Sequence, residues 1–219
     1  MNGAIGDVLP LALGVAISPI PIIAVILMLL APRAGGTSFG FLVGWVGGIV
    51  VATTVFAVLA NVIGLQSGGQ PSAAVSWIKI LLGLLMLALA WKQWRSRPKA
   101  GAQGELPGWM KAIDQMTPAK GAALGFALSA VNPKNLMMCV GAGVSVAQAG
   151  AYVVPIVVFT VIAASTVAIP VVAYAVAAER MRGPLNELRG WLEQNNATVM
   201  FVLLLVIGAV LLGKGIGGL

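Results

Sequence analysis

The stretch Ala12-Leu-Gly-Val-Ala-Ile-Ser18 occurs again, 111 residues later, as Ala123-Leu-Gly-Phe-Ala-Leu-Ser129. Five of the seven positions are identical, and the other two exchange one apolar side chain for another. Proline follows each copy, at Pro19 and Pro21 in the first and at Pro133 in the second. This shared order favours a duplicated chain over a chance likeness between two stretches rich in Ala, Leu and Gly.

Apolar segments dominate the chain around these two copies. Of its 219 residues, 59% are hydrophobic and only 9% are charged, whereas soluble domains carry roughly 25% charged residues. A bilayer core of about 30 Å is crossed by about 20 apolar residues in helical form. Six segments qualify, and we therefore predict an all-α integral membrane protein with spans at Val8–Leu30, Phe39–Ile63, Trp77–Trp94, Pro118–Val140, Tyr152–Ala178 and Ala197–Leu212.

The repeat divides these six transmembrane helices into two groups of three. Because three is an odd number, the second group enters the membrane from the opposite side, which predicts a 3+3 inverted repeat of the kind found in secondary transporters. The two halves are expected at residues 1–98 and 118–219, with a linker at 99–117. In that linker Trp109, Ile113 and Met116 share one helical face, which is compatible with a short helix in the cytoplasmic interface; the alternative is a simple linker.

Basic residues predict the topology. The loops after the first, third and fifth segments hold ten of them: Arg33, Lys92, Arg95, Arg97, Lys99, Lys111, Lys120, Arg180, Arg182 and Arg189. The other side has only Lys79 and Lys214. Since loops rich in Lys and Arg stay in the cytoplasm, we expect a multi-pass protein of the plasma membrane with a cytoplasmic central loop and both termini outside. The net charge of +7 is then explained by these loops and anionic headgroups, so no nucleic-acid partner is expected.

Two proline-containing stretches are candidates for a transport site. A proline inside a helix frees a backbone carbonyl, and broken helices in an inverted repeat build substrate sites near the middle of the bilayer. The candidates of the first half are Ser18, Pro19, Pro21 and Thr54. Those of the second half are Ser129, Asn132, Pro133, Lys134, Asn135 and Ser165, where Ser165 lies 111 residues after Thr54.

Lys134 is the strongest of these candidates. A lysine within the hydrocarbon costs roughly 2.5–3.5 kcal/mol, so it should face a cavity or a partner. Neither proline stretch contains a carboxylate, which leaves freed carbonyls as protein partners and an anionic substrate group as a functional partner. The alternative is that its flexible side chain snorkels outward to the headgroups.

The residues missing from the sequence exclude several other functions. The chain has no histidine and a single cysteine, Cys139, and none of its six acidic residues lies in the interior of a predicted span. These absences exclude an internal disulfide, a Cys/His metal centre and a Ser-His-Asp triad, so no catalytic residue, metal or cofactor is predicted and the chain is not expected to be an enzyme. Small residues at intervals of four, Gly40, Gly44 and Gly48, and Gly121 and Gly125, favour close helix packing, either within the chain or in a homodimer.

Several of these motifs, in this order, resemble those of the GAP family, which includes the sulfolipid-addressing and glycopeptidolipid-addressing proteins and belongs to the LysE superfamily of small exporters. The matching features are Ser18-Pro-Ile-Pro21, Trp109-Met-Lys-Ala-Ile-Asp114, Thr117-Pro118, Val131-Asn-Pro-Lys-Asn-Leu136, Pro170 and Trp191. The likeness spans essentially the whole chain, and its most specific part is the Asn-Pro-Lys-Asn-Leu stretch. The electron-carrying branch of that superfamily needs paired cysteines, which this chain does not have.

The resemblance implies a role in moving a cell-envelope lipid or glycolipid across the plasma membrane. The expected partners are the lipid bilayer and a lipid or other small anionic substrate. Two hypotheses remain open at this stage. The chain is itself the exporter, or it is a non-transporting scaffold that assists a larger lipid exporter.

Overall fold

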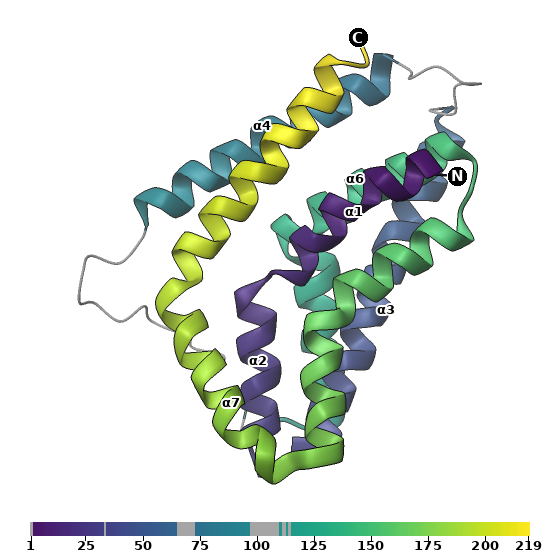
Figure 1. Ribbon diagram of the computed structural model, residues 1–219. Coiled ribbons are helices and arrows are strands. Elements are labelled where there is room, and N and C mark those ends of the chain that lie inside the picture. Colours follow the sequence, from purple (N-terminus) through teal and green to yellow (C-terminus); the bar gives the residue numbers. More distant parts are fainter. Residues whose placement is uncertain (1, 33, 65–72, 97–109, 111–112, 114) are drawn as a thin grey trace.

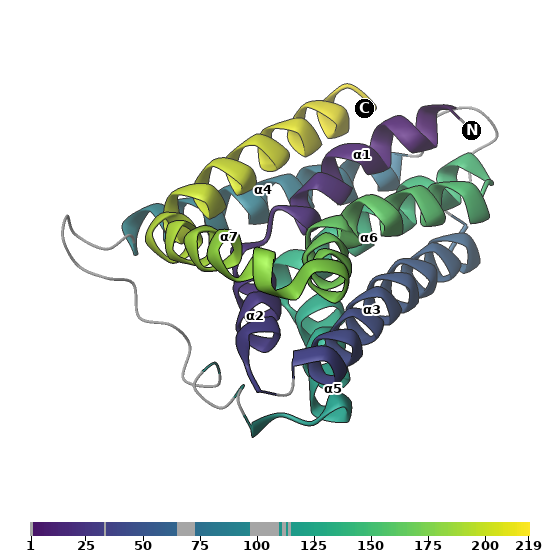
Figure 2. The ribbon, with the colours of Figure 1, turned by 60° about the horizontal axis from the view of Figure 1, so that its bottom comes forward.

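The computed structural model describes residues 2–32, 34–64, 73–96, 110, 113 and 115–219. Within these ranges the regular elements are helices and no strand occurs, which confirms the all-α prediction. Figures 1 and 2 show their arrangement from two sides. In chain order they are α1 (Asn2–Ala16), α2 (Pro19–Leu30), α3 (Ala34–Val62), α4 (Ala73–Arg95), α5 (Pro118–Phe126), the π-helix η2 (Ala127–Val131), α6 (Pro133–Ala149) and α7 (Val153–Ile216).

The first predicted span is two helices rather than one. Ser18 is extended, with φ −105° and ψ 104°, and Pro19 begins α2 where its missing N–H costs no hydrogen bond. The axes of α1 and α2 differ by 51° across this break. The carbonyls at the end of α1 therefore lose the donors that a continuous helix would supply.

The fourth predicted span is broken in the same way. Thr117 caps α5 by accepting a hydrogen bond from the Lys120 N–H at 3.3 Å. The helix then widens into η2, whose last turn is closed by a hydrogen bond of 3.1 Å from the Asn132 N–H to the Ala127 carbonyl. Asn132 is extended and Pro133 starts α6, which continues to Ala149, beyond the predicted end at Val140.

The fifth and sixth predicted spans are joined in one element, α7, of 64 residues. Its backbone leaves helical geometry at Ala177 (φ −144°, ψ 54°), and the helix doubles back there (Figure 1). We call residues 153–176 the first arm and residues 178–216 the second arm. The stretch at 179–196, expected to be a loop, is helical, because Arg189 pairs with Glu193 one turn later (2.6 Å) while Leu185 and Leu192 are buried.

Glycines explain how α3 and α5 approach each other. A Cβ on Gly44 would overlap the Ala122 carbonyl, and one on Gly125 would overlap the Phe41 carbonyl. Gly40, Gly48 and Gly121 face the same interface. Of the two uses that the sequence left open for these glycines, close packing within the chain is the one that the structure shows.

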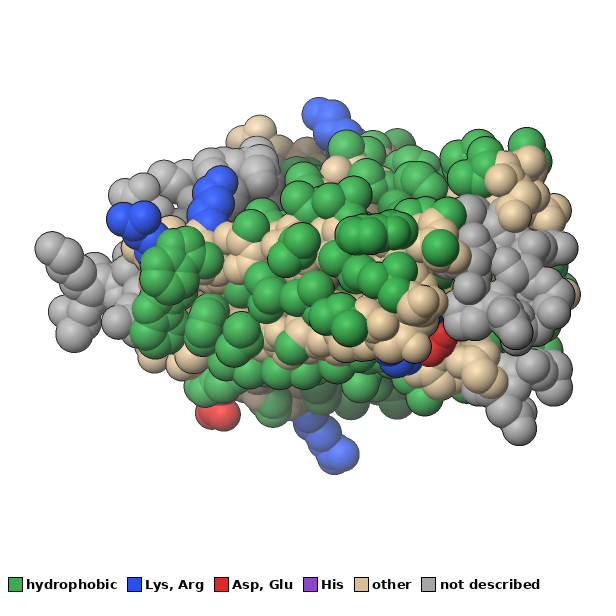
Figure 3. Space-filling view, turned by 90° about the horizontal axis from the view of Figure 1, so that it is seen from above, with side chains coloured by type: hydrophobic (Ala, Val, Ile, Leu, Met, Phe, Trp, Pro, Cys, Tyr) green, Lys and Arg blue, Asp and Glu red, His purple; other side chains and the backbone are tan. Residues whose placement is uncertain are grey.

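The outer surface and the helix lengths suit a bilayer. Within the described ranges three helices, α3, α4 and α7, are long and apolar enough to cross a membrane, and the bent pair α1–α2 makes a fourth if it counts as one span. This count by length and composition does not establish the predicted six spans. Hydrophobic side chains cover most of the face drawn in Figure 3.

Both termini lie at the same end of the molecule (Figure 1). Near that end Asp7 of α1 accepts a hydrogen bond from Lys214 of α7 at 2.5 Å and lies 3.7 Å from the ammonium of Lys79 on α4. Lys79 also donates a hydrogen bond to Gln148 of α6 at 3.3 Å. These four side chains join the helices α1, α4, α6 and α7.

Most of the linker expected at 99–117, including Trp109 of its proposed interfacial helix, lies outside the described residues, as do Arg33, Arg97, Lys99 and Lys111. The structure does describe Met110 and Ile113, and both are buried. The Met116 carbonyl accepts a hydrogen bond from the Thr37 hydroxyl at 3.1 Å, which fastens the end of the linker to α3.

Candidate functional site

The side chain of Lys134 joins the two helix breaks. It projects from the first turn of α6, only 6% of it is exposed, and its ammonium donates to the Gly14 carbonyl at 2.7 Å and to the Ser18 hydroxyl at 3.1 Å. Both acceptors belong to the first break, which is 116 to 120 residues away in the chain. The lysine therefore does not snorkel to the headgroups but points into the protein.

A second polar side chain closes the same break from another direction. Thr166, on the first arm of α7, donates its hydroxyl to the Ala16 carbonyl at 2.6 Å. Ala16 is the last residue of α1, so this carbonyl is one of those that the break leaves without a helical donor. Lys134 and Thr166 thus supply side-chain donors where the backbone of α1 has none.

Polar residues of the second break stabilise the start of α6. Asn132 caps the helix by accepting from the Lys134 N–H at 3.1 Å, which fixes the lysine backbone. Asn135 is fully buried and donates to the Leu128 carbonyl at 2.8 Å. Its Oδ1 atom has no hydrogen-bond partner among the described residues. Ser129 of η2, also buried, donates to the Gly125 carbonyl of α5 at 2.9 Å, one turn earlier.

The other predicted site residues differ in how far they are buried. Pro19 and Pro21 are buried at the start of α2, whereas Pro133 is exposed. Thr54 is exposed on α3 and does not join the break site. Ser165 is half-buried and donates to the Ile162 carbonyl of its own helix.

Sequence reasoning missed Gly14 and Thr166. Thr166 directly follows the predicted Ser165, and on α3 it is Thr53, next to the predicted Thr54, that is buried. A hydroxyl side chain in an otherwise apolar span is a feature that the sequence does show. It does not indicate which of two adjacent hydroxyl residues points into the protein.

The site is a buried basic side chain inside an apolar protein. An ammonium has three N–H donors, and among the described residues Lys134 has two acceptors, neither of them charged. An ammonium at this position therefore has one N–H without an acceptor in the described part of the chain. No group of three His, Cys, Asp or Glu side chains that could hold a metal ion occurs in the described part of the chain.

A family model described as "Sap, sulfolipid-1-addressing protein" matches residues 8–217, which include both helix breaks and both arms of α7. No curated protein and no solved structure matches the chain.

Proposed function

Because the chain belongs to the Sap (sulfolipid-1-addressing protein) family, we propose that it is an exporter of the LysE superfamily that moves an anionic cell-envelope lipid or glycolipid across the plasma membrane. The observation that carries the proposal is the buried Lys134, held between two helix breaks with no carboxylate partner among the described residues. In this proposal its ammonium binds the sulfate, phosphate or carboxylate of the substrate. Asn135, whose Oδ1 is unpartnered, supplies a further polar group.

The proposed architecture is a 3+3 inverted repeat with six spans. In this architecture α1 corresponds to α5 with η2, and α2 corresponds to α6. Both groups are interrupted just before a proline that begins the next helix, Pro19 in the first and Pro133 in the second. Then α3 corresponds to the first arm of α7, and α4 to the part of the second arm that follows residue 196. The contacts of α3 with α5 and α6 have their counterparts in the contacts of α7 with α1 and α2, and α4 contacts α7, which supports this pairing of the halves.

A transport mechanism follows from the break site. The Lys134 ammonium binds the end of α1 through one neutral carbonyl and one hydroxyl, both of which an anion can replace as acceptors. When the substrate takes these positions, the connection between α6 and the α1–α2 break is lost. Movement of the two halves relative to each other would then open the site to the other side of the membrane.

The test uses purified protein in vesicles that contain a fluorescent phosphatidylglycerol, with fluorescent phosphatidylcholine as the uncharged comparison. An impermeant quencher outside the vesicles measures how fast each lipid changes leaflets. We expect the protein to accelerate the anionic lipid, Lys134→Met to lose this acceleration by about tenfold or more, and Lys134→Arg to keep part of it. A tenfold loss equals about 1.4 kcal/mol.

The control variant is Lys120→Met, which removes an exposed lysine at the start of α5. Elution of each variant as a single species from a sizing column separates a transport defect from a folding defect. Full activity of a well-folded Lys134→Met variant would contradict the site assignment. Flux that requires a membrane extract from the producing cell would instead support the accessory role for a larger lipid exporter.

A further inference from the structure

A groove of about 490 Å³ lies between α1 and the second arm of α7. Its volume is within the range of about 300–1,000 Å³ that is typical of ligand sites. Apolar side chains make up nearly all of its lining. The residues that line it are Pro10, Leu13, Gly14, Ile17, Trp191, Asn195, Thr198, Val199, Val202, Leu203, Val206 and Ile207.

The groove opens to the surface that faces lipid. Leu13 and Ile17 on one wall are 50% and 44% exposed, and Val202 and Val206 on the other are 50% and 54% exposed. The α7 wall, from Trp191 to Ile207, extends for about 24 Å at 1.5 Å per residue, and the α1 wall, from Pro10 to Ile17, covers about 10 Å of that length. Its length and direction therefore match an acyl chain that lies along the helices.

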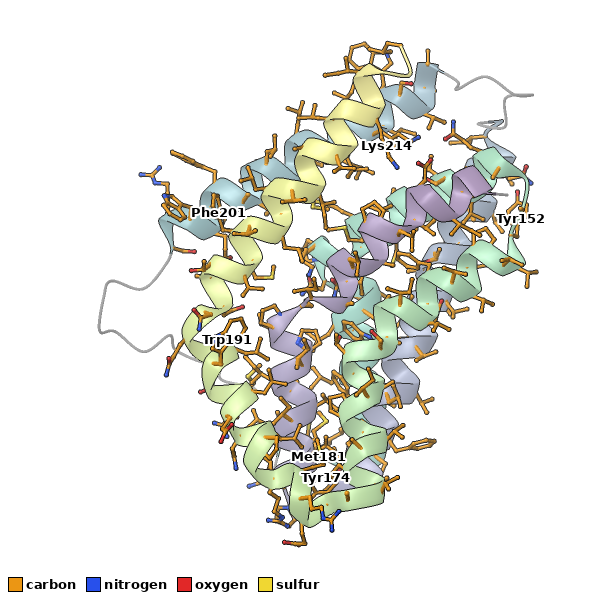
Figure 4. The ribbon with its side chains drawn as sticks, in the orientation of Figure 1. Tyr152, Tyr174, Met181, Trp191, Phe201 and Lys214 are labelled. Carbon is orange, nitrogen blue, oxygen red and sulfur yellow. The ribbon has the colours of Figure 1, made fainter. Side chains whose placement is uncertain are left out.

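The two ends of the groove differ in polarity. Pro10, Val206 and Ile207 form an apolar end. Trp191, Asn195 and Thr198 gather at the other, where Asn195 donates to the Trp191 carbonyl at 2.8 Å. Trp191 lies on α7 level with the beginning of α2 (Figure 4). An amphipathic molecule placed here would have its polar part beside the α1–α2 break.

Gly14 connects the groove with the buried lysine. It is a lining residue of the groove, and its carbonyl accepts the hydrogen bond from the Lys134 ammonium. A Cβ on Gly14 would come within 2.5 Å of Ile207 and 2.9 Å of Met138, so α1 and α7 are packed as closely here as a glycine allows. Gly14 is thus shared by the groove and by the hydrogen bond of Lys134, which does not itself line the groove.

Building on the proposed function, we infer that this groove holds an acyl chain of the transported lipid while its anionic headgroup reaches Lys134. The lipid then enters from the side, out of the bilayer, rather than through an aqueous mouth. A bilayer lipid is the occupant that fits, because the groove is apolar, has exposed apolar walls, and is lined by Gly14, whose carbonyl accepts from the ammonium that an anionic headgroup would need to reach.

The experiment measures binding rather than transport. Purified protein in phosphatidylcholine vesicles receives a small fraction of phosphatidic acid with a photoreactive diazirine in its acyl chain, and labelled peptides are identified by mass spectrometry. We expect the label in residues 10–17 and 191–207. Val202→Trp and Val206→Trp, which fill the groove, should lower this labelling at least threefold.

Leu205→Trp is the matched control, because Leu205 is 43% exposed on the same arm but does not line the groove. It should leave the labelling unchanged. Labelling that is spread evenly over the lipid-facing helices, or that falls equally in the groove and control variants, would overturn the inference. Groove labelling without flux by the purified protein would keep the binding site and reject only the exporter function. Flux without groove labelling would keep the exporter function and reject the groove as the binding site of the acyl chain.

Discussion

At the scale of single residues, the partners of Lys134 matter more than its burial. A lysine paired with a carboxylate would be neutralised within the protein and would have little attraction left for a substrate. The Gly14 carbonyl and the Ser18 hydroxyl carry no charge, so they satisfy two donors without cancelling the positive charge. An apolar surrounding strengthens the attraction of that charge for an anion.

Thr166 offers the sharpest test of how the break is stabilised. Thr166→Val keeps the shape of the side chain but removes the donor to the Ala16 carbonyl. Hydrogen bonds between membrane helices contribute about 0.6 kcal/mol on average and about 1.7 kcal/mol at most. We expect a loss of unfolding free energy in this range, measured by denaturant titration in mixed micelles.

The neighbouring Ser165→Ala is its control, because Ser165 bonds only within its own helix. It should change the unfolding free energy by less than Thr166→Val does. Equal losses of unfolding free energy in both variants would show that the hydrogen bond from the Thr166 hydroxyl to the Ala16 carbonyl does not stabilise the protein.

At the scale of helices, the sequence predicts where the helices break, but it does not show which side of each helix faces the interior of the protein. Proline chemistry is local, so Ser18-Pro19 and Asn132-Pro133 could be recognised as interruptions from the chain alone. In a span that is apolar on all sides, no polar face indicates which residues point inward. Thr54 and Ser165 were predicted from the 111-residue offset of the repeat, and this offset does not show that the neighbouring Thr53 is buried or that Thr166 bonds the Ala16 carbonyl.

Contacts between distant segments were equally hidden from the sequence. Thr166 bonds a carbonyl 150 residues away, and the glycines of α3 have their partners on α5. Spacing alone showed that these glycines suit close packing but not which helix they meet. The helical stretch at 179–196 was missed because its charged residues were taken for a loop, although they are spaced to pair along a helix.

Gly44→Leu should disrupt the packing of α3 against α5. Its side chain would overlap the backbone of Ala122, which cannot move without separating the helices. Overpacking costs typically about 1–3 kcal/mol, and a backbone clash is expected at or above the upper end. The measurements are the yield of membrane-extracted protein and its melting temperature in detergent.

Gly47→Leu is the matched variant on the same helix, because nothing lies within 4 Å of a Cβ at Gly47. It should fold and melt like the unchanged protein. If Gly44→Leu were equally well tolerated, the close approach of α3 and α5 would be refuted.

At the scale of the whole molecule, charge is distributed unevenly between the two ends. At the end where the termini lie, Asp7 is shared by Lys79 and Lys214, so half of the positive charge of these two lysines is compensated. Of the other described basic residues, Arg180, Arg182 and Arg189 follow the bend of α7 and Lys92 and Arg95 end α4. Each of these positions belongs to the loop set for which the positive-inside rule predicts the cytoplasm.

The orientation that follows from this asymmetry places the termini outside the cell and the end of α4 inside. Two single-cysteine additions test it: Leu219→Cys at the end that carries the termini, and Ser96→Cys just after α4, both at exposed positions. An impermeant maleimide should label position 219 on intact cells and position 96 only after the membrane is permeabilised. The unchanged chain should stay unlabelled in both cases, because its one thiol, Cys139, is buried. Labelling of position 96 but not of position 219 on intact cells would reverse the orientation, and the lipid would then meet the polar end of the groove from the opposite leaflet.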